Sequence, residues 1–474
     1  MRFMQKKEYT VMTRFRLTKE LETYLYAFVT EYNKIYRYMW KKMTACDYAQ
    51  NYPKDSYFVT EICQTFGLLK RTVNSLRYDI KGRMKAYMEL KKTEREQLVI
   101  KITLQEKKVA EITETVNKLK ELASKNKLNE KQLNTYRKLK QSLYWQKNKW
   151  NQRKQNLSRL DYQIKNNVYS MGFGGKDMFC KQYHLSENGY KTHEKWYHDF
   201  VKARDKNMFY LGSSDETQGN QLFQMTYNKD TDDFSFRLRK ENAWCTGSKQ
   251  TDNYIQMEHI NFKHLHEELK AEVLLHQNKQ GTSPLTYRFH REGTKWYMQV
   301  IFPLKCKEYE TYSKYGVIGL DYNDGFIELS ETDEKGNLVY QKHYDLNYHG
   351  CGRKAENEMR NVVHKICAYA KCKGKDIAIE DLSFQKTKAK TEKAKSVNGK
   401  AYNQMLHLFD YRRYIDTMRN TSHRMHVCLT IVKAYHTSKI GKKKYCEKKK
   451  LNVHQAASYV IARRGQGFSD TVVV

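Results

Sequence analysis

Two carboxylates and one imidazole occupy positions at which strands end and a helix begins. Asp321 directly follows the apolar run 317–320 of "YGVIGLDYNDGFIELS", and Glu380 lies in the alternating strand "KDIAIEDLSF". His454 stands in the first turn of the helix expected for "NVHQAASYVIARRG". A carboxylate in a buried strand is costly unless a partner faces it, and neighbouring carboxylates stay charged only with cations between them. We therefore predict that Asp321, Glu380 and His454 are catalytic and bind metal. Two Mg²⁺ ions, or Mn²⁺ in their place, would activate water for phosphodiester cleavage.

Each of these residues also has a simpler interpretation. Asp321 alone could be an edge-strand carboxylate, and Glu380 alone could pair with a lysine. A single histidine in the first turn of a helix is more often a hydrogen-bonded surface residue, and imidazole binds Mg²⁺ less well than carboxylate does. Asn452 and Gln455 are spaced like a helix cap and its partner, and the positive helix end favours a neutral His454. The metal interpretation therefore rests on the joint placement of the three side chains.

The elements around these residues follow a definite order. Hydrophobic periodicity predicts three strands, a helix, a strand, a helix over about 402–425, a fifth strand and a last helix. This is the order of an RNase H-like fold, in which the first strand, the fourth strand and the last helix bring acidic groups together. Asp321, Glu380 and His454 lie on those three elements.

The rest of the chain is predicted to be helical and then antiparallel. The alternating "YTVMTRFRL" predicts a strand, and an amphipathic helix follows it. From about 84 to 165 the sequence is highly charged, with a short heptad seam, and predicts a helical hairpin arm that Asn129 and Gln132 cap at its second helix. This arm is either a solvated spacer or a basic grip on a duplex. Between about 207 and 305 the period of two predicts a small antiparallel sheet or barrel.

A glycine-rich segment at 170–179, "SMGFGGKDMF", ends the helical region. It has neither the full spacing of a P-loop nor a clear strand before it. We interpret it as a flexible turn and predict no nucleotide binding there.

The composition points to nucleic acid as the partner. The chain has 474 residues with 87 Lys and Arg against 53 Asp and Glu, a formal net charge of +34. Such an excess, distributed along the whole chain with 37 tyrosines interleaved, suits phosphate contact and base stacking. No apolar run reaches membrane length and no signal peptide is evident, so we expect no membrane partner and a cytoplasmic, nucleoid-associated protein. The ten cysteines form no CxxC pair, so no structural zinc is expected.

Three motifs make a family resemblance specific. "GLDYNDGFIELS", "IAIEDLSF" and "NVHQAASYVIARRG" resemble the three RuvC motifs of transposon-encoded TnpB nucleases and of the related compact type V CRISPR effectors. The N-terminal "TRFRLTKELETYLYAFVTEYNKIYRYMW" resembles the start of TnpB, and "KAYHTSKIG" resembles the stretch after its fifth strand. The similarity covers the chain in order.

The resemblance implies an α+β multidomain protein. Its expected parts are the first strand of a β-barrel (wedge) domain at 1–16, a helical recognition region at 17–200 with its hairpin arm, the remaining small antiparallel β-barrel at 201–312, and a C-terminal RNase H-like (RuvC) α/β domain at 313–474. Proteins of this family bind a guide RNA and cleave complementary double-stranded DNA beside a short flanking motif. The resemblance thus implies an RNA-guided DNA endonuclease whose first two metal ligands are Asp321 and Glu380.

The sequence departs from the family in two places. His454 stands where the family normally has Asp, and Asp470 lies beyond the helix as a poor substitute. The usual zinc knuckle is missing, and a lysine-rich segment replaces it, either as a basic loop contacting nucleic acid or as a solvated charge run. The residues predicted to bind nucleic acid are Arg14, Arg16, Arg37, Arg71, Arg77, Lys442, Lys443, Lys444, Arg463 and Arg464.

Two other functions stay open. A nuclease-inactive, RNA-guided DNA-binding repressor would explain His454 and the missing knuckle, whereas the retained Asp321 and Glu380 argue against it. An unguided RNase H-fold transposase would bind terminal DNA sequences without RNA.

Overall fold

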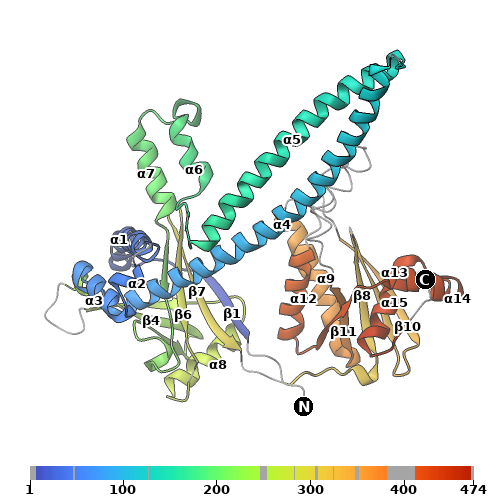
Figure 1. Ribbon diagram of the computed structural model, residues 1–474. Coiled ribbons are helices and arrows are strands. Elements are labelled where there is room, and N and C mark those ends of the chain that lie inside the picture. The colour runs from blue at the N-terminus through green and yellow to red at the C-terminus, as the bar shows by residue number, and fades with distance from the viewer. Residues whose placement is uncertain are drawn as a thin grey trace. The chain divides into compact units, whose positions relative to one another are not determined.

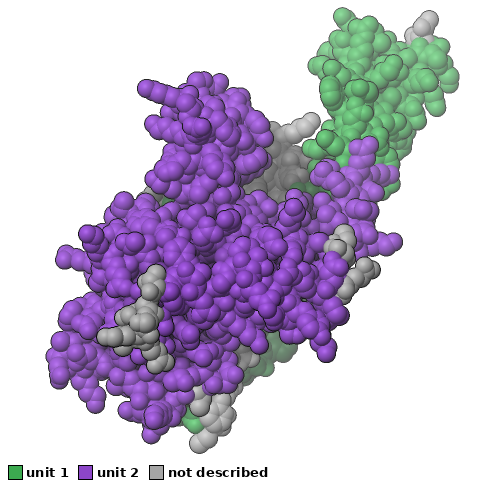
Figure 2. Space-filling model, turned by 90° about the vertical axis from the view of Figure 1, so that its left-hand side faces the viewer, with its two compact units in different colours: residues 1–5, 97–153, 306–474 green, residues 6–96, 154–305 purple. Residues whose placement is uncertain are grey.

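The computed structural model describes residues 7–45, 48–125, 127–245, 253–281, 283–304, 308–323, 325–346, 352–381 and 411–470. The chain forms two compact units, which Figure 2 colours separately. The N-terminal unit comprises residues 6–96 and 154–305, and the C-terminal unit comprises residues 1–5, 97–153 and 306–474. Each unit has its own hydrophobic core. In the described part of the chain, no helix combines the length and the apolar character that a membrane span needs.

The N-terminal unit contains two antiparallel sheets. One has the strand order β1-β7-β6-β2 and the other the order β3-β4-β5. Among the described strands no pairing joins the two sheets, so a closed barrel is not seen there. Just before β6 the amide of Leu285 donates to the carbonyl oxygen of Gly219, which lies just before β3, at 3.0 Å. The strands are β1 (Lys7–Arg14), β2 (Asn207–Tyr210), β3 (Phe223–Asn228), β4 (Asp233–Arg239), β5 (Tyr254–Ile260), β6 (Thr286–Glu292) and β7 (Lys295–Leu304).

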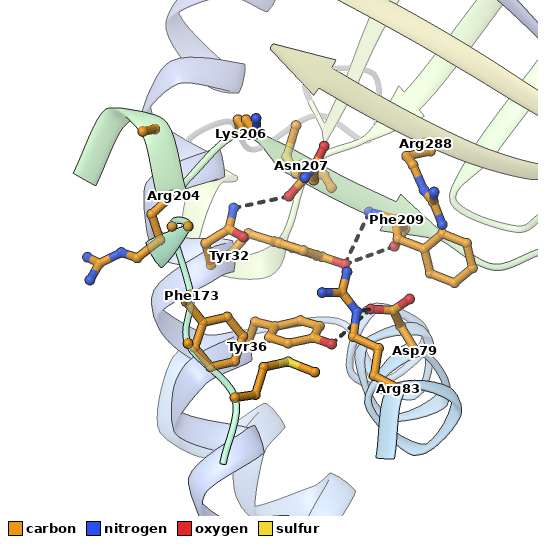
Figure 3. Close-up of a pocket in the computed structure, with 17 residues that line it drawn as sticks. Tyr32, Tyr36, Asp79, Arg83, Phe173, Arg204, Lys206, Asn207, Phe209 and Arg288 are labelled. Carbon is orange, nitrogen blue, oxygen red and sulfur yellow. Dashed lines mark hydrogen bonds and ion pairs between the residues drawn. The ribbon is translucent and has the colours of Figure 1, made fainter. Parts of the chain in front are cut away.

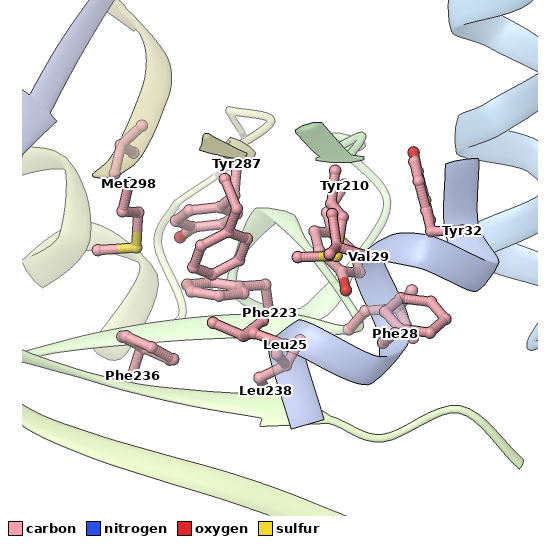
Figure 4. Packing of buried hydrophobic residues seen from close by; sticks show 14 of the residues in the cluster. Leu25, Phe28, Val29, Tyr32, Tyr210, Phe223, Phe236, Leu238, Tyr287 and Met298 are labelled. Atoms are coloured by element: carbon pink, nitrogen blue, oxygen red, sulfur yellow. The ribbon is translucent and has the colours of Figure 1, made fainter. Parts of the chain in front are cut away.

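Aromatic rings fill the space between these sheets (Figure 4). The ring centroid of Phe223 on β3 is 4.1 Å from that of Tyr287 and 5.5 Å from that of Phe289, both on β6. Helix α1 covers this core with Leu25 and Phe28, which belong to the apolar stripe expected from the sequence and are fully buried. The helices of the unit are α1 (Lys19–Met43), α2 (Tyr48–Asn51), α3 (Asp55–Phe66), α6 (Lys176–Cys180), α7 (His193–Arg204) and α8 (His266–Gln277).

The predicted hairpin arm is present. Helices α4 (Lys70–Ser124) and α5 (Glu130–Lys165) run antiparallel over most of their length (Figure 1). The reciprocal cap of Asn129 and Gln132 starts α5, with distances of 2.8 and 3.0 Å. Midway along the arm, the fully buried Gln105 donates through Nε2 to the side-chain and main-chain oxygens of Gln146, at 2.7 and 3.1 Å. Arg153 of α5 adds a second polar contact beside it, because its guanidinium donates to the main-chain oxygen of Lys101 at 3.2 Å.

The C-terminal unit contains a five-stranded sheet with the order β10-β9-β8-β11-β12. The first three strands pair antiparallel, and β8, β11 and β12 pair parallel. The predicted order of three strands, helix, strand, helix, strand and helix is confirmed. The predicted helix over 402–425 is described from Tyr411 on, and its earlier residues lie outside the described part. The strands are β8 (Val317–Asn323), β9 (Phe326–Thr332), β10 (Leu338–Asp345), β11 (Asp376–Asp381) and β12 (Leu429–Lys433).

The two faces of this sheet are covered by different helices. Ile318 and Leu320 of β8 point into the core formed with α9 (Gly352–Lys373) and α12 (Tyr411–Arg424). Val317, with the opposite parity, packs against Ile461 of α15 (Val453–Gly465). Because side chains alternate along a strand, Asp321 lies on the face of α15.

The lysine-rich segment between β12 and α15 is helical. Short helices α13 (Thr437–Gly441) and α14 (Glu447–Lys449) flank a π-helical turn, Lys442–Cys446. The sequence predicted a loop here, and that prediction was wrong. Gly441 packs against the backbone of Ala456, where a Cβ would lie 2.8 Å from the carbonyl carbon, so the segment is held against α15.

Candidate active site

Asp321 and Glu380 lie side by side at the ends of two neighbouring parallel strands. Strands β8 and β11 pair with Leu320 opposite Ile379, so Asp321 and Glu380 are the next residues of each strand. Aligned residues of paired strands point to the same face of a sheet. Both residues are buried, each with 7% of its surface exposed. The structure thus brings together the two carboxylates on which the sequence prediction depends.

A glycine in β8 lets the last helix lie directly on the sheet. At Gly319 a Cβ would lie 2.2 Å from the carbonyl oxygen of Ser458 and 2.3 Å from the amide nitrogen of Ala462, both in α15. The Ser330 hydroxyl of β9 lies 2.6 Å from the Ser458 hydroxyl. Helix and sheet are therefore in backbone contact near the carboxylates.

This contact brings the start of α15 to Asp321. The predicted capping box of Asn452 and Gln455 is present and fixes where the helix begins. His454 Nδ1 is 3.2 Å from Asp321 Oδ2, and the edge of the His454 ring packs against Phe326 with 5.2 Å between centroids. The hydrogen bond with Asp321 raises the pKa of His454, although partial burial lowers it. The neighbouring carboxylate thus acts against the neutral imidazole expected from the helix end.

The environment of Glu380 disfavours its charge. Burial raises the pKa of Glu380, and the negative charge of Asp321 raises it further. A hydrogen bond from Thr437 and the guanidinium charge of Arg464 act in the opposite direction. Asp321 in turn accepts a hydrogen bond of 2.8 Å from the amide of Asn323. Two buried carboxylates that repel each other form a place where a divalent cation would be stabilised.

A third carboxylate, missed by the sequence prediction, belongs to the same face. Glu328 on β9 pairs directly with Asp321 on β8 and is 3% exposed. Its Oε1 is 2.8 Å from His343 Nδ1, whose Nε2 is 3.1 Å from Asp345 Oδ1. Its Oε2 is buried with no hydrogen-bond partner among the described residues. The sequence did contain a signal: an Asp-Gly pair after Asn323 indicates a two-residue hairpin turn, which aligns position 321 with 328.

The carboxylates of this face are oxygen donors of the kind that divalent cations take. Within the described ranges, no group of three or more His, Cys, Asp or Glu side chains is positioned to hold a metal ion by itself. Mg²⁺ usually takes only one or two protein carboxylates and completes its shell with water and substrate phosphates. Glu328 has a buried oxygen without a hydrogen-bond partner among the described residues, and the charged form of Glu380 is disfavoured by burial and by Asp321. Both supply carboxylate oxygens that a cation could take as ligands.

Three of the predicted basic residues line a cavity of about 820 Å³ in the C-terminal unit. These are Lys442, Lys443 and Arg464. Arg464 is held by hydrogen bonds of 2.7 and 2.6 Å to the main-chain oxygens of Lys433 and Tyr435, and its charge reaches Glu380. The cavity therefore presents cations beside the carboxylate face.

Lys444 and Arg463 have a different environment. Both contact the buried Asp470, with Nζ of Lys444 at 3.5 Å and Nε of Arg463 at 2.9 Å. Arg463 also donates to the main-chain oxygen of Gly336 at 2.8 Å. Asp470 therefore binds these two cations and accepts a hydrogen bond from the Tyr445 hydroxyl, and it is not part of the candidate site.

The predicted basic residues of the N-terminal unit also fall into two groups, those without an ion pair among the described residues and those paired with carboxylates. Arg14 and Arg16 are exposed and have no ion pair within the described part of the chain. The other three form ion pairs with carboxylates, which compensate their charge locally. The pairs are Arg37 with Asp205, Arg71 with Glu216, and Arg77 with Asp55.

Comparison with solved structures gives weak likenesses, of which two are described here. No protein-family model matches the chain, and no curated protein sequence matches it. A Cas12f1–sgRNA–target DNA complex solved by cryo-EM aligns with 97% of this chain and 99% of its own, at 11% identity and a TM-score of 0.36. RuvC of T. thermophilus in complex with a Holliday junction aligns with 31% of this chain and 89% of its own, at 11% identity and a TM-score of 0.22. With scores this low, the argument for function rests on the residues of this chain.

Proposed function

We propose that this protein is an RNA-guided DNA endonuclease that cleaves target DNA in a RuvC-like site. The observation that carries the proposal is the burial of Asp321 and Glu380 at adjacent ends of parallel strands, beside the first turn of the last helix. This is the place at which an RNase H-like nuclease needs its metal-binding acids. The requirement for a guide RNA rests on the motif resemblance and on the net charge of +34.

Each side chain has a role in this proposal. A bound divalent metal would supply an activated water and stabilise the leaving oxygen. Asp321 and Glu380 would hold it, with Glu328 as a further oxygen donor. Asn323 and Thr437 orient the first two carboxylates through the hydrogen bonds described above, and His454 holds Oδ2 of Asp321.

The basic surfaces would bind the nucleic acid backbone. Lys442, Lys443 and Arg464 are proposed to contact the strand that enters the site, because their cavity adjoins the carboxylate face. Arg14 and Arg16 are proposed to contact the guide or the flanking duplex. The wedge, recognition and RuvC domains would keep the boundaries given by the sequence.

A nuclease-inactive, RNA-guided binding protein is the second candidate. One observation favours it: Oδ2 of Asp321 already accepts from Asn323, and His454 contacts the same oxygen, so less of this carboxylate is open to a metal. In such a protein the imidazole would compensate the charge of Asp321 in place of a cation.

Cleavage by matched variants separates the two candidates. We would first sequence the RNA that co-purifies with the protein expressed from its native flanking DNA, and then use that guide with a matched duplex and Mg²⁺. Wild type should cut and Glu380→Gln should not. Glu331→Gln is the control, since Glu331 is equally buried but hydrogen-bonds with Tyr369 and Lys375 instead.

The outcomes are distinct. Guided binding without cutting by wild type would establish the inactive binder. Cutting that survives Glu380→Gln would refute the site assignment. Heterogeneous cellular RNA in place of one discrete species would refute the guided function.

A further inference from the structure

A cavity of about 370 Å³ in the N-terminal unit has no role in the proposed nuclease (Figure 3). It lies between α1, the first part of α4, the segment 171–175, the end of α7, and strands β2 and β6. Its volume is within the range of roughly 300–1,000 Å³ typical of small-molecule sites.

The cavity has an excess of positive charge. Four basic residues line it, against one acid, Asp79. Asp79 is already neutralised by Arg83, whose Nε lies at 2.9 Å, and Arg204 pairs with a neighbouring aspartate. Lys206 and Arg288 are partly buried, and within the described ranges neither has a carboxylate at ion-pair distance. Two partly desolvated cations without counter-charges favour an anion.

The aromatic side chains of the cavity wall are held in place. The Tyr32 hydroxyl donates to the carbonyl oxygen of Phe209 and accepts from its amide, both at 3.1 Å. The Tyr36 hydroxyl donates to Asp79 at 2.9 Å, and its ring meets Phe173 edge to face at 6.0 Å. Tyr32 and Tyr36 are almost fully buried, so they support the wall, and the partly buried Phe173 is left to contact a planar group. A ring held in place by its neighbours loses little conformational entropy in such a contact.

Two amide side chains leave hydrogen-bonding groups available. Asn33 uses Nδ2 for the main-chain oxygens of Val29 and Asn207, at 2.8 and 3.0 Å. Asn207 uses Oδ1 for His290 Nδ1 at 2.6 Å. Asn33 Oδ1 and Asn207 Nδ2 therefore remain, one acceptor and one donor without a partner among the described residues. An acceptor and a donor near aromatic rings match the polar edge of a nucleobase.

We propose that this cavity binds one phosphate-bearing nucleotide. Lys206 and Arg288 hold the phosphate, the partly buried ring of Phe173 packs against the base, and the amides of Asn33 and Asn207 contact the edge of the base. The segment "SMGFGGKDMF" is no P-loop, but Gly172 and Gly175 form part of the cavity wall with their backbone alone. An added Cβ at either glycine would meet nothing within 4 Å. A free mononucleotide and an unpaired nucleotide of an RNA or DNA strand share this chemistry.

Calorimetry with adenosine 5′-monophosphate on the full chain, at about 150 mM salt to screen non-specific contacts, tests the proposal. Wild type should bind one equivalent, roughly tenfold more tightly than it binds inorganic phosphate, because the base adds stacking. Lys206→Gln should weaken binding by roughly tenfold or more. Lys229→Gln, in the exposed turn between β3 and β4, makes the same charge change outside the cavity and should leave binding unchanged.

Gly172→Leu tests the location without changing charge, and it should block binding while thermal unfolding stays that of wild type. Equal affinity for the mononucleotide and for inorganic phosphate would overturn the proposal, as would equal losses in Lys206→Gln and Lys229→Gln. Competition with a 5′-phosphorylated trinucleotide RNA distinguishes the sources: tighter binding of the trinucleotide identifies a strand unit, and weaker binding identifies a free nucleotide. No cleavage is measured, so the result is independent of the nuclease proposal.

Discussion

Replacing Gly319 with alanine should displace α15 from the sheet at the point where the helix positions His454 beside Asp321. The new Cβ would lie 2.2 Å from the carbonyl oxygen of Ser458. An ordinary C···O contact is about 3.3 Å, so helix and strand must separate by roughly 1 Å. The obstacle is backbone and cannot rotate away, so we expect a loss of about 3 kcal/mol, the upper part of the usual range for overpacking.

The assay must report on the C-terminal unit itself. None of the six tryptophans lies in this sheet, and the two in the C-terminal unit, Trp145 and Trp150, belong to the hairpin arm, so tryptophan fluorescence does not follow the sheet. Hydrogen exchange of peptides covering α15 reports on the sheet directly. A loss of about 3 kcal/mol would make exchange through opening of the unit roughly 150-fold faster. Gly82→Ala in α4 is the matched control, because a Cβ there meets nothing within 4 Å and should stabilise its helix by about 0.5–1 kcal/mol. If α15 in Gly319→Ala exchanged as slowly as in wild type, the close crossing would not hold the helix in place. If the proposed nuclease is active, a misplacement of about 1 Å should also cost roughly 100-fold in cleavage.

Four further perturbations test other parts of the structure. Burial raises the pKa of Glu241 from 4.5 to about 7, so between these pH values the folded state keeps a proton that the unfolded state releases. The free energy of unfolding should therefore fall by about 3 kcal/mol from pH 4.5 to 7. Denaturation midpoints measured over this range should lose this pH dependence in Glu241→Gln. Arg37→Met removes one cation from the buried Asp205 and should lower the free energy of unfolding in urea by about 2 kcal/mol. The salt dependence of nucleic acid binding should stay unchanged, and a weaker salt dependence would instead show that Arg37 contacts phosphate. Asn452→Ala should cost about 1 kcal/mol through loss of the cap of α15, and unchanged exchange there would contradict this. Glu328→Gln should weaken Mn²⁺ binding, followed by electron paramagnetic resonance, and wild-type affinity would exclude Glu328 as a ligand.

The order of elements in the C-terminal unit could be predicted because its strands and helices have clear periods. Asp321 and Glu380 could be placed together for the same reason, since each ends a buried strand. Glu328 was missed although the hairpin turn specified its register, because its position looked like an ordinary acid in a strand. Its role became visible only through the pairing with Asp321.

Ion pairs over long sequence separations could not be predicted in this way. Arg37 and Asp205 are 168 residues apart, and Arg71 reaches Glu216. No periodicity specifies such partners, so a basic residue that neutralises a buried acid looks the same in sequence as one that meets phosphate. The small antiparallel sheets could be predicted, but closure into a barrel could not. Alternation predicts strands, and it does not specify whether two sheets pair at their edges.

The buried glutamine contact of the hairpin arm has a consequence for how this arm can change in length. Gln105 and Gln146 fix the register of α4 and α5 at one level, because any sliding would leave the buried amide of Gln105 unpaired. Beyond that level the two helices continue only to a short connection near residue 127. Deleting seven residues from each helix, between this contact and the tip, would preserve the heptad pairing of the two helices and the contact between Gln105 and Gln146. Deletions of three or four residues in one helix alone would not. The arm therefore offers a defined site for shortening or extending the protein in whole repeats.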